Sequence, residues 1–148
     1  MDAVASIISI VQLTGTLAEY LRAATHAPAD RRRILLETNT LLALLKSLQD
    51  FVTVEDDEEH LQWRQAVAQL ESPGGPFAQY QAALESLLRK IYPQSRMRRA
   101  AQTVLWKMTK EDIDDLLQRI ERMKSLISIA LEMDHLYKCL RRRRCTKY

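Results

Sequence analysis

The sequence predicts an all-α domain, a helical bundle of about five helices that ends in a long C-terminal helix. Breakers are scarce, with 3 glycines and 4 prolines in 148 residues, well below average usage. Apolar residues recur three and four positions apart, the period of a packed helix. Runs of β-branched residues with frequent turns, which sheets need, are few. A chain of this length favours one domain with its own core; we assign residues 1–140 to the bundle and 141–148 to a basic tail.

The first predicted helix is unusual because residues 3–18 carry no charge. Its apolar side chains point in nearly every direction, which is typical of a helix that lies centrally in a bundle or contacts lipid. Sixteen residues fall short of the roughly 20 that span a bilayer. No basic residue precedes them, as a secretory signal would require. We expect a buried bundle helix at rest, with membrane insertion as a second state.

The second helix follows Pro28, with Asp30 as its expected cap. Its apolar positions are spaced 4,3,4,3,4, which predicts a packed seam: Ile34, Thr38, Leu41, Leu45, Leu48 and Val52, widened by Leu35, Leu42 and Leu44. Acidic residues at Glu55–Glu59 are expected to begin a third helix, because carboxylates favour the positive end of the helix dipole. They lack the alternating ligands and the turn glycine of a calcium loop.

The run from Ser72 to Pro76 is the strongest breaker in the chain and predicts a tight link between antiparallel helices. The next helix then presents one apolar face and ends at Pro93: Phe77, Tyr80, Leu84, Leu87, Leu88 and Ile91. A shorter basic segment is expected from Ser95 to Met108.

The long last helix is predicted to begin at a capping box formed by Thr109 and Asp112, with a shorter acid than the usual glutamate. A 4,3,4,3 seam follows: Leu116, Ile120, Met123, Ile127 and Ala130. Asp134 and His135 interrupt this seam. Tyr137 and Leu140 resume it before the terminal arginines.

The sequence offers no recognisable catalytic or cofactor-binding motif. Its glycines, at positions 15, 74 and 75, cannot form a dinucleotide fingerprint or a P-loop. The histidines, His26, His60 and His135, form no HExxH pair, and no serine lies in a GxSxG elbow. We therefore predict that the protein is not an enzyme and has no cofactor. Cys139 and Cys145 fit no zinc module, no histidine is placed to complete one, and reduced thiols favour an intracellular compartment.

The net charge is only +3, but its distribution is uneven. Residues 47–63 carry acids alone, residues 89–110 carry basic residues alone, and basic residues recur from Lys138 to the C-terminus. Such runs are typical of solvated helix faces, and they would also attract anionic partners. Nucleic acid is the less favoured of these partners, because no recognition helix, aromatic strand motif or zinc module accompanies the arginines. Anionic lipid is attracted by the same charges, particularly beside an apolar segment.

Several segments along the chain carry a family resemblance: Val4–Leu13 with Gly15, Pro28–Leu48, the Ser-Pro-Gly-Gly-Pro-Phe turn at 72–77, Trp106, Ile120–Leu126 and Ala130–His135. In this order they resemble fungal HeLo-like N-terminal domains up to about residue 137. The resemblance implies a helical head that usually precedes a nucleotide-binding or ankyrin-repeat region in fungal NLR-like proteins. No such region occurs in this chain, and residues 141–148 depart from the family pattern.

Relatives of this head, including the HeLo domain and the four-helix head of the mixed-lineage-kinase-like pseudokinase, cause programmed cell death by permeabilising membranes. Their contexts are heterokaryon incompatibility and innate immunity. The resemblance associates membrane activity with the N-terminal helix, here Val4–Leu21. The candidate insertion residues are Val4, Ile7, Ile8, Val11, Leu13, Gly15 and Leu17, with Gly15 as a point of flexibility or close packing. The candidate contacts to anionic lipid are Arg96, Arg98, Arg99, Arg141, Arg142, Arg143 and Arg144.

The leading hypothesis is thus a cytoplasmic cell-death effector or signalling head that moves to the plasma membrane. Its expected partners are anionic lipids, further copies of itself on activation, and an NLR-like receptor or a further region of its own chain. The alternative is a protein-interaction domain of an NLR-like receptor that recruits a partner without permeabilising membranes.

Overall fold

The computed structural model describes residues 3–54, 67–92 and 105–145. Four helices have both ends within these ranges: α1 (Ala3–Ala23), α2 (Arg31–Val54), α4 (Pro76–Ile91) and α5 (Lys110–Cys145). Residues 67–71 form a further helical piece. The described residues contain no strand beyond a single bridge between Thr25 and Leu105. The predicted all-α bundle with a long C-terminal helix is confirmed.

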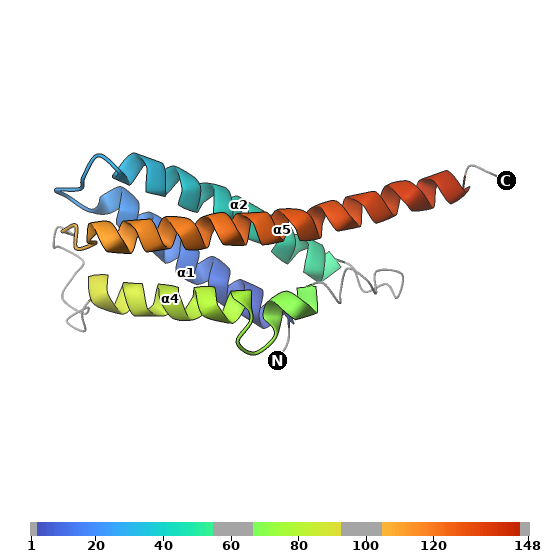
Figure 1. The fold of residues 1–148 in the computed structure, drawn as a ribbon, viewed down its shortest axis with the longest axis horizontal. Helices are drawn as coiled ribbons and strands as arrows, with labels where there is room; N and C mark the ends of the chain where they lie inside the picture. The colour runs from blue at the N-terminus through green and yellow to red at the C-terminus, as the bar shows by residue number, and fades with distance from the viewer. Residues whose placement is uncertain (1–2, 55–66, 93–104, 146–148) are drawn as a thin grey trace.

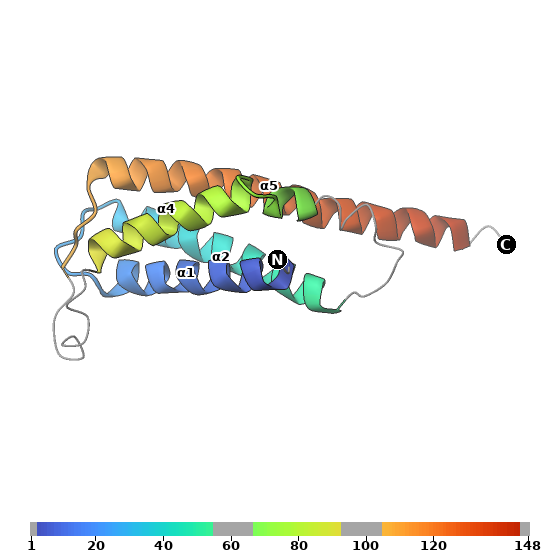
Figure 2. The same ribbon diagram turned by 90° about the horizontal axis from the view of Figure 1, so that it is seen from below.

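The labelled helices form a closed ring in which each has two neighbours. Both α1 and α5 pack against α2 and α4. In Figure 1, α1 and α4 run from right to left, whereas α2 and α5 run from left to right, and Figure 2 shows the same directions from below. The labelled helices α1, α2, α4 and α5 therefore alternate in direction along the chain, which is the up-down arrangement of a helical bundle.

The core contains most of the side chains that the helical spacing predicts, although Leu42, which was expected to widen the α2 face, is half-buried and outside the core cluster. On α2, Ile34, Thr38, Leu41, Leu45 and Leu48 are fully buried, and Val52, Leu35 and Leu44 pack against the core at its edge. The predicted α5 seam from Leu116 to Ala130 is buried, and Ile113 extends it by one turn. The α4 face is buried except for the half-buried Leu87. An ion pair between Lys124 of α5 and Glu37 of α2 borders the seam between these helices.

The corner between α1 and α2 is shaped by the backbone at His26 and held by the side chain of Arg31. Helix α1 ends at Ala23, five residues before Pro28, and α2 begins directly after Asp30. His26 adopts a positive φ of 59°, a conformation that non-glycine residues seldom adopt. The Arg31 guanidinium donates a 2.9 Å hydrogen bond to the Ala24 carbonyl. The chain therefore turns before Pro28, and Arg31 satisfies a carbonyl that the end of α1 leaves free.

The turn at Ser72–Gly75 requires both of its glycines. Gly74 has a φ of +75°, and a Cβ on Gly75 would lie 2.8 Å from the Ser72 carbonyl oxygen. Pro76 then begins α4 at a position where a missing N–H costs nothing. In Figures 1 and 2 the piece 67–71 and α4 lie roughly end to end and run in the same direction. The prediction of an antiparallel link is therefore wrong, because the turn interrupts the helix without reversing the chain.

The start of α5 has the predicted capping box. The Asp112 amide donates to the Thr109 hydroxyl at 3.2 Å, and the Thr109 amide donates to the Asp112 carboxylate at 3.0 Å. Lys90 of α4 bonds the same carboxylate at 2.6 Å. These contacts hold the pKa of Asp112 below its usual value, the hydrogen bond from Lys90 being the main cause.

The other end of α5 lies apart from the bundle. With 36 residues, α5 is about 54 Å long at 1.5 Å per residue. Its C-terminal part extends beyond the ends of the other labelled helices (Figures 1 and 2). The predicted third helix start at Glu55–Glu59 and the basic segment from Ser95 as far as residue 104 lie outside the described residues.

Candidate functional site

The predicted insertion residues of α1 are divided between the core and the surface. Ile7 and Leu17 are fully buried, and Val11 and Leu13 are half-buried against the core. Ile8 lies on the outside of the bundle with 36% of its surface exposed. Val4 lies in α1, but its side chain is outside the description. The helix is therefore buried on most sides rather than all round, with an exposed strip that includes Ile8.

Gly15 does not have the close-packing role that the sequence suggested. A Cβ built on this residue meets no atom within 4 Å. Its neighbours on α1, Thr14 and Ala18, are the small residues that lie buried in the core. The helix contact is therefore made beside Gly15 and does not depend on the missing side chain.

A buried polar contact joins α1 to α4. The Thr14 hydroxyl and the Tyr80 hydroxyl lie 2.9 Å apart, and either can be the donor. Burial raises the pKa of Tyr80 to about 12, although the hydrogen bond to Thr14 acts in the opposite direction. The other buried hydroxyl, that of Thr38, bonds the Ile34 carbonyl of its own helix. Among the described residues, the Thr14–Tyr80 contact is thus the fully buried side-chain hydrogen bond that crosses between helices.

Tyr20 fixes the other end of α1 to the segment that precedes α5. Its hydroxyl accepts a 2.6 Å hydrogen bond from the Lys107 amide and donates to the Leu105 carbonyl at 3.2 Å. Its ring stacks on Trp106 at a centroid distance of 5.8 Å and meets Tyr92 edge-on at 5.7 Å. Burial raises the pKa of Tyr20, so its phenol remains a neutral donor. Helix α1 is therefore tied down at its middle and at its C-terminal end.

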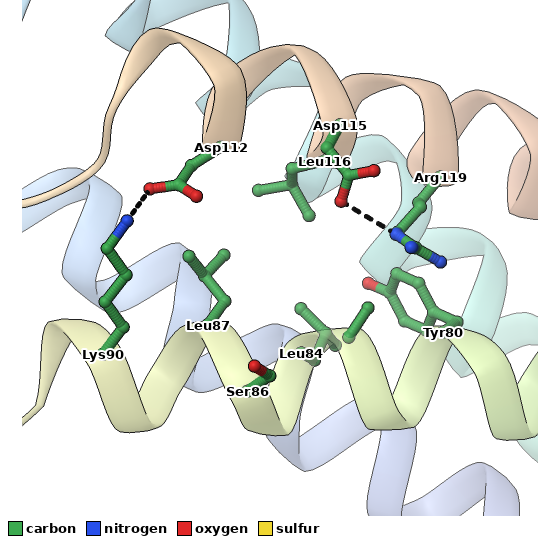
Figure 3. A pocket seen from close by; sticks show the side chains of 10 residues that line it. Tyr80, Leu84, Ser86, Leu87, Lys90, Asp112, Asp115, Leu116 and Arg119 are labelled. Carbon is green, nitrogen blue, oxygen red and sulfur yellow. Dashed lines mark hydrogen bonds and ion pairs between the residues drawn. The ribbon is translucent and has the colours of Figure 1, made fainter.

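A groove of about 270 Å³ opens between α4 and α5. Figure 3 shows leucine side chains and Tyr80 inside it, with the Lys90–Asp112 ion pair at one end and the Asp115–Arg119 pair at the other. At the rim, Lys90 donates a hydrogen bond to the Asp112 carboxylate, which lowers the pKa of Asp112. A general acid needs the opposite shift in pKa. The groove thus has the layout of a packing seam with a charged rim.

The predicted lipid-contact arginines are only partly described. Arg96, Arg98 and Arg99 lie outside the described residues. Arg142 and Arg143 are exposed on the last turns of α5, and Arg141 and Arg144 lie in the same helix with side chains outside the description. The basic run at 141–144 is thus part of α5, and the predicted boundary at residue 140 marks no break in the helix.

An exposed apolar stripe on α5 was missed by the sequence interpretation. Ile129, Met133 and Leu136 are each well exposed, Leu136 at 61%. Their spacing of four and three places them on one face of the helix, away from the buried seam. The same spacing is visible in the sequence, but the seam at Leu116–Ala130 accounted for the helix period and hid this second stripe.

A histidine does lie beside one of the cysteines, contrary to the sequence interpretation. His135 Nε2 is 3.9 Å from Cys139 Sγ, and both side chains are exposed on the projecting part of α5. The separation of four residues is one helical turn, which is the signal that could have identified the pair. No group of three or more His, Cys, Asp or Glu side chains suited to a metal is found within the described ranges.

Comparison of this chain with protein-family models, with curated proteins and with solved structures finds no match. Within residues 3–54, 67–92 and 105–145, no helix combines the length and hydropathy needed to cross a membrane. Over the described residues, the fold is an up-down bundle of the helices α1, α2, α4 and α5, and the C-terminal part of α5 projects beyond the other three.

Proposed function

We propose that this protein is a membrane-targeting cell-death effector or signalling head, and that α1 is its latent membrane-active segment. The observation that carries the proposal is that α1 is uncharged over most of its length and is largely buried in the bundle. It has no charged residue from Ala3 to Ala18, and the bundle fully buries three of its large apolar side chains, Ile7, Ile10 and Leu17. The bundle core thus buries a segment whose apolar composition would suit contact with lipid.

Release of α1 would have to overcome a large part of the stability of the domain. Burying one large apolar side chain contributes about 1.5–3 kcal/mol. The fully buried Ile7, Ile10, Leu17 and Leu21 together account for about 6–12 kcal/mol on that scale, which is comparable with the roughly 5–15 kcal/mol of a whole domain. The proposed mechanism therefore needs oligomerisation, driven by an NLR-like receptor or a further region of the chain, together with lipid that receives the helix.

Basic side chains would guide the head from the cytoplasm to the inner face of the plasma membrane. Each arginine near an anionic leaflet contributes about 1 kcal/mol of attraction. Arg142 and Arg143 are exposed at the tip of α5, where the bundle does not cover them. This placement supports an approach of the α5 tip to the anionic surface.

Dye release from vesicles tests this function with the full chain. We expect leakage from phosphatidylserine-containing vesicles and much less from neutral phosphatidylcholine vesicles. Ile8→Glu places a charge on α1 at an exposed position, so the bundle remains folded while insertion becomes costly. Leu36→Glu is the matched control, because Leu36 is exposed at 64% on α2. Leakage should fall at least fivefold for Ile8→Glu and remain near the wild-type level for Leu36→Glu.

The proposal fails if the full chain releases no dye from anionic vesicles at any concentration. It also fails if the two glutamate variants behave alike, because leakage would then not depend on α1.

A second candidate, a protein-interaction domain that does not permeabilise membranes, is favoured by the exposed stripe of Ile129, Met133 and Leu136. A stripe of this spacing fits the apolar face of a partner helix. If this candidate is correct, the chain releases no dye, and Leu136→Ser abolishes binding to the receptor that carries the partner helix while Leu36→Ser leaves it unchanged.

A further inference from the structure

Two side chains that bind metals well lie together on the projecting part of α5. The Sγ atom of Cys139 is 3.9 Å from the Nε2 atom of His135. Both residues are exposed, so solvent ions can reach them. They are four residues apart, so the helix itself places them on one face.

The separation of the two atoms is close to what one metal ion requires. Zinc binds sulfur at about 2.3 Å and histidine nitrogen at about 2.0–2.1 Å with tetrahedral angles. Two such ligands on one ion lie roughly 3.5 Å apart by these bond lengths. The observed 3.9 Å closes to this value by a small rotation of two exposed side chains. Thiolate and imidazole together are the donors that select zinc and other thiophilic ions over magnesium or calcium.

We propose that His135 and Cys139 chelate a thiophilic divalent cation, with Zn²⁺ as the preferred ion. On binding, the Cys139 thiol releases its proton to solvent and its sulfur forms a bond to the ion. The Nε2 lone pair of His135 forms the second bond, which leaves the remaining proton of the imidazole on Nδ1. No electron is transferred, and water completes the coordination. This inference does not depend on the proposed membrane function.

The chain contains its own matched control in Cys145. That residue lies on the last turn of α5, six residues after Cys139, and the residue four positions before it is Arg141 rather than a histidine. A general effect of zinc on thiols would not distinguish Cys139 from Cys145. A chelate with His135 would act on Cys139 alone.

The test is alkylation of the reduced full chain with iodoacetamide, with and without added Zn²⁺, and with each cysteine followed by peptide mass spectrometry. We expect Zn²⁺ to slow alkylation of Cys139 at least tenfold while Cys145 slows less than twofold. His135→Gln should remove the protection of Cys139. Co²⁺ as a spectroscopic substitute should produce a thiolate-to-metal absorption band in the wild type that Cys139→Ser eliminates and Cys145→Ser retains.

Equal slowing of both thiols by Zn²⁺ would overturn the proposal, as would full protection of Cys139 in the His135→Gln variant. The exposed position of His135 means that the substitution leaves the core intact, and circular dichroism of the variant confirms its helix content. Dye release plays no part in this experiment, so failure of the zinc site and failure of the membrane function are separate results.

Discussion

Helix α1 and the projecting end of α5 differ in the burial of their apolar side chains. Helix α1 is free of charge over residues 3–18, yet Ile7, Ile10 and Leu17 are fully buried. The projecting end of α5 is rich in charge, and it exposes the large apolar side chain of Leu136. The difference arises from neighbours, since α1 lies between α2 and α4 and the end of α5 extends past both (Figure 1).

The comparison shows that hydropathy alone does not identify the surface that meets a partner. The most apolar helix, α1, buries most of its apolar side chains within the bundle. Helix α5 has a lower mean hydropathy, yet it has an exposed apolar stripe. In the proposed function these are two stages of one event. The α5 tip is available at once, and α1 becomes available only when its contacts with α2 and α4 are broken.

Alanine substitutions at matched leucines should produce the largest contrast between the two regions. Leu17→Ala removes a fully buried side chain of α1 and should lower the free energy of unfolding by about 2–5 kcal/mol. Leu136→Ala removes an exposed side chain of α5 and should change it by no more than about 0.5 kcal/mol. Urea unfolding followed by circular dichroism measures both, and similar losses for the two variants would show that the α5 end is also packed.

Loss of the Thr14–Tyr80 contact, which joins α1 to α4, should cause the next largest change in the free energy of unfolding. Tyr80→Phe leaves the buried Thr14 hydroxyl without its partner on α4, at a cost of about 1–3 kcal/mol. The double variant Thr14→Val with Tyr80→Phe should cost less than the sum of the two single variants, because it leaves no unpaired hydroxyl. A double-mutant cycle by urea unfolding gives the coupling, and strict additivity would mean that the contact does not tie α1 to α4.

Alkaline pH should weaken the same contact. The pKa of Tyr80 is raised from 10.0 to about 12, so the neutral phenol is favoured in the folded state. The stability that it contributes is fully present below pH 10 and is lost as the pH rises through the folded value. A shift of this size corresponds to on the order of 3 kcal/mol. Compared with the wild type, Tyr80→Phe should lose less stability between pH 9 and 12, and equal losses would assign the effect to other groups.

The capping box at the start of α5 should have the smallest measurable effect. Thr109→Ala removes the side-chain acceptor of the Asp112 amide and should cost about 1 kcal/mol. Because the pKa of Asp112 is lowered, its stabilisation is present above the ordinary carboxyl pKa and disappears as the pH falls through the folded value. Thermal unfolding at pH 7 and at pH 3 should show a smaller difference between wild type and Asp112→Asn at the lower pH, and an unchanged difference would contradict this role.

The helices and their cores followed from spacing, because burial on a helix repeats with its period. The seams at Ile34–Leu48 and Leu116–Ala130 and the Thr109–Asp112 cap were therefore predictable. The direction of the chain after Gly75 was not predictable, because a turn of glycines and prolines permits either a reversal or a bend. The exposure of Ile8 was equally unpredictable. Nearly every face of α1 is apolar, so only the positions of α2 and α4 decide which face is left exposed.

The candidate site was less predictable than the core. The contact between Thr14 and Tyr80 joins residues that are 66 positions apart, and no local pattern announces it. The same is true of Tyr20, whose partners Leu105 and Lys107 lie 85 and 87 positions further along the chain. The His135–Cys139 pair was visible in principle, since it rests on one turn of helix, but it requires α5 to continue past the interruption of its apolar seam at Asp134 and His135.

The most direct test of the central claim follows α1 itself. An environment-sensitive fluorophore is attached to a cysteine at position 8, and in a second protein at position 36, each with Cys139→Ser and Cys145→Ser. Both positions are exposed in the bundle, so labelling leaves the fold intact. On addition of anionic vesicles that contain a nitroxide-labelled lipid, we expect a blue shift and quenching at position 8 and little change at position 36. Vesicle leakage with no quenching at position 8, or equal quenching at both positions, would contradict the release of α1 into the membrane.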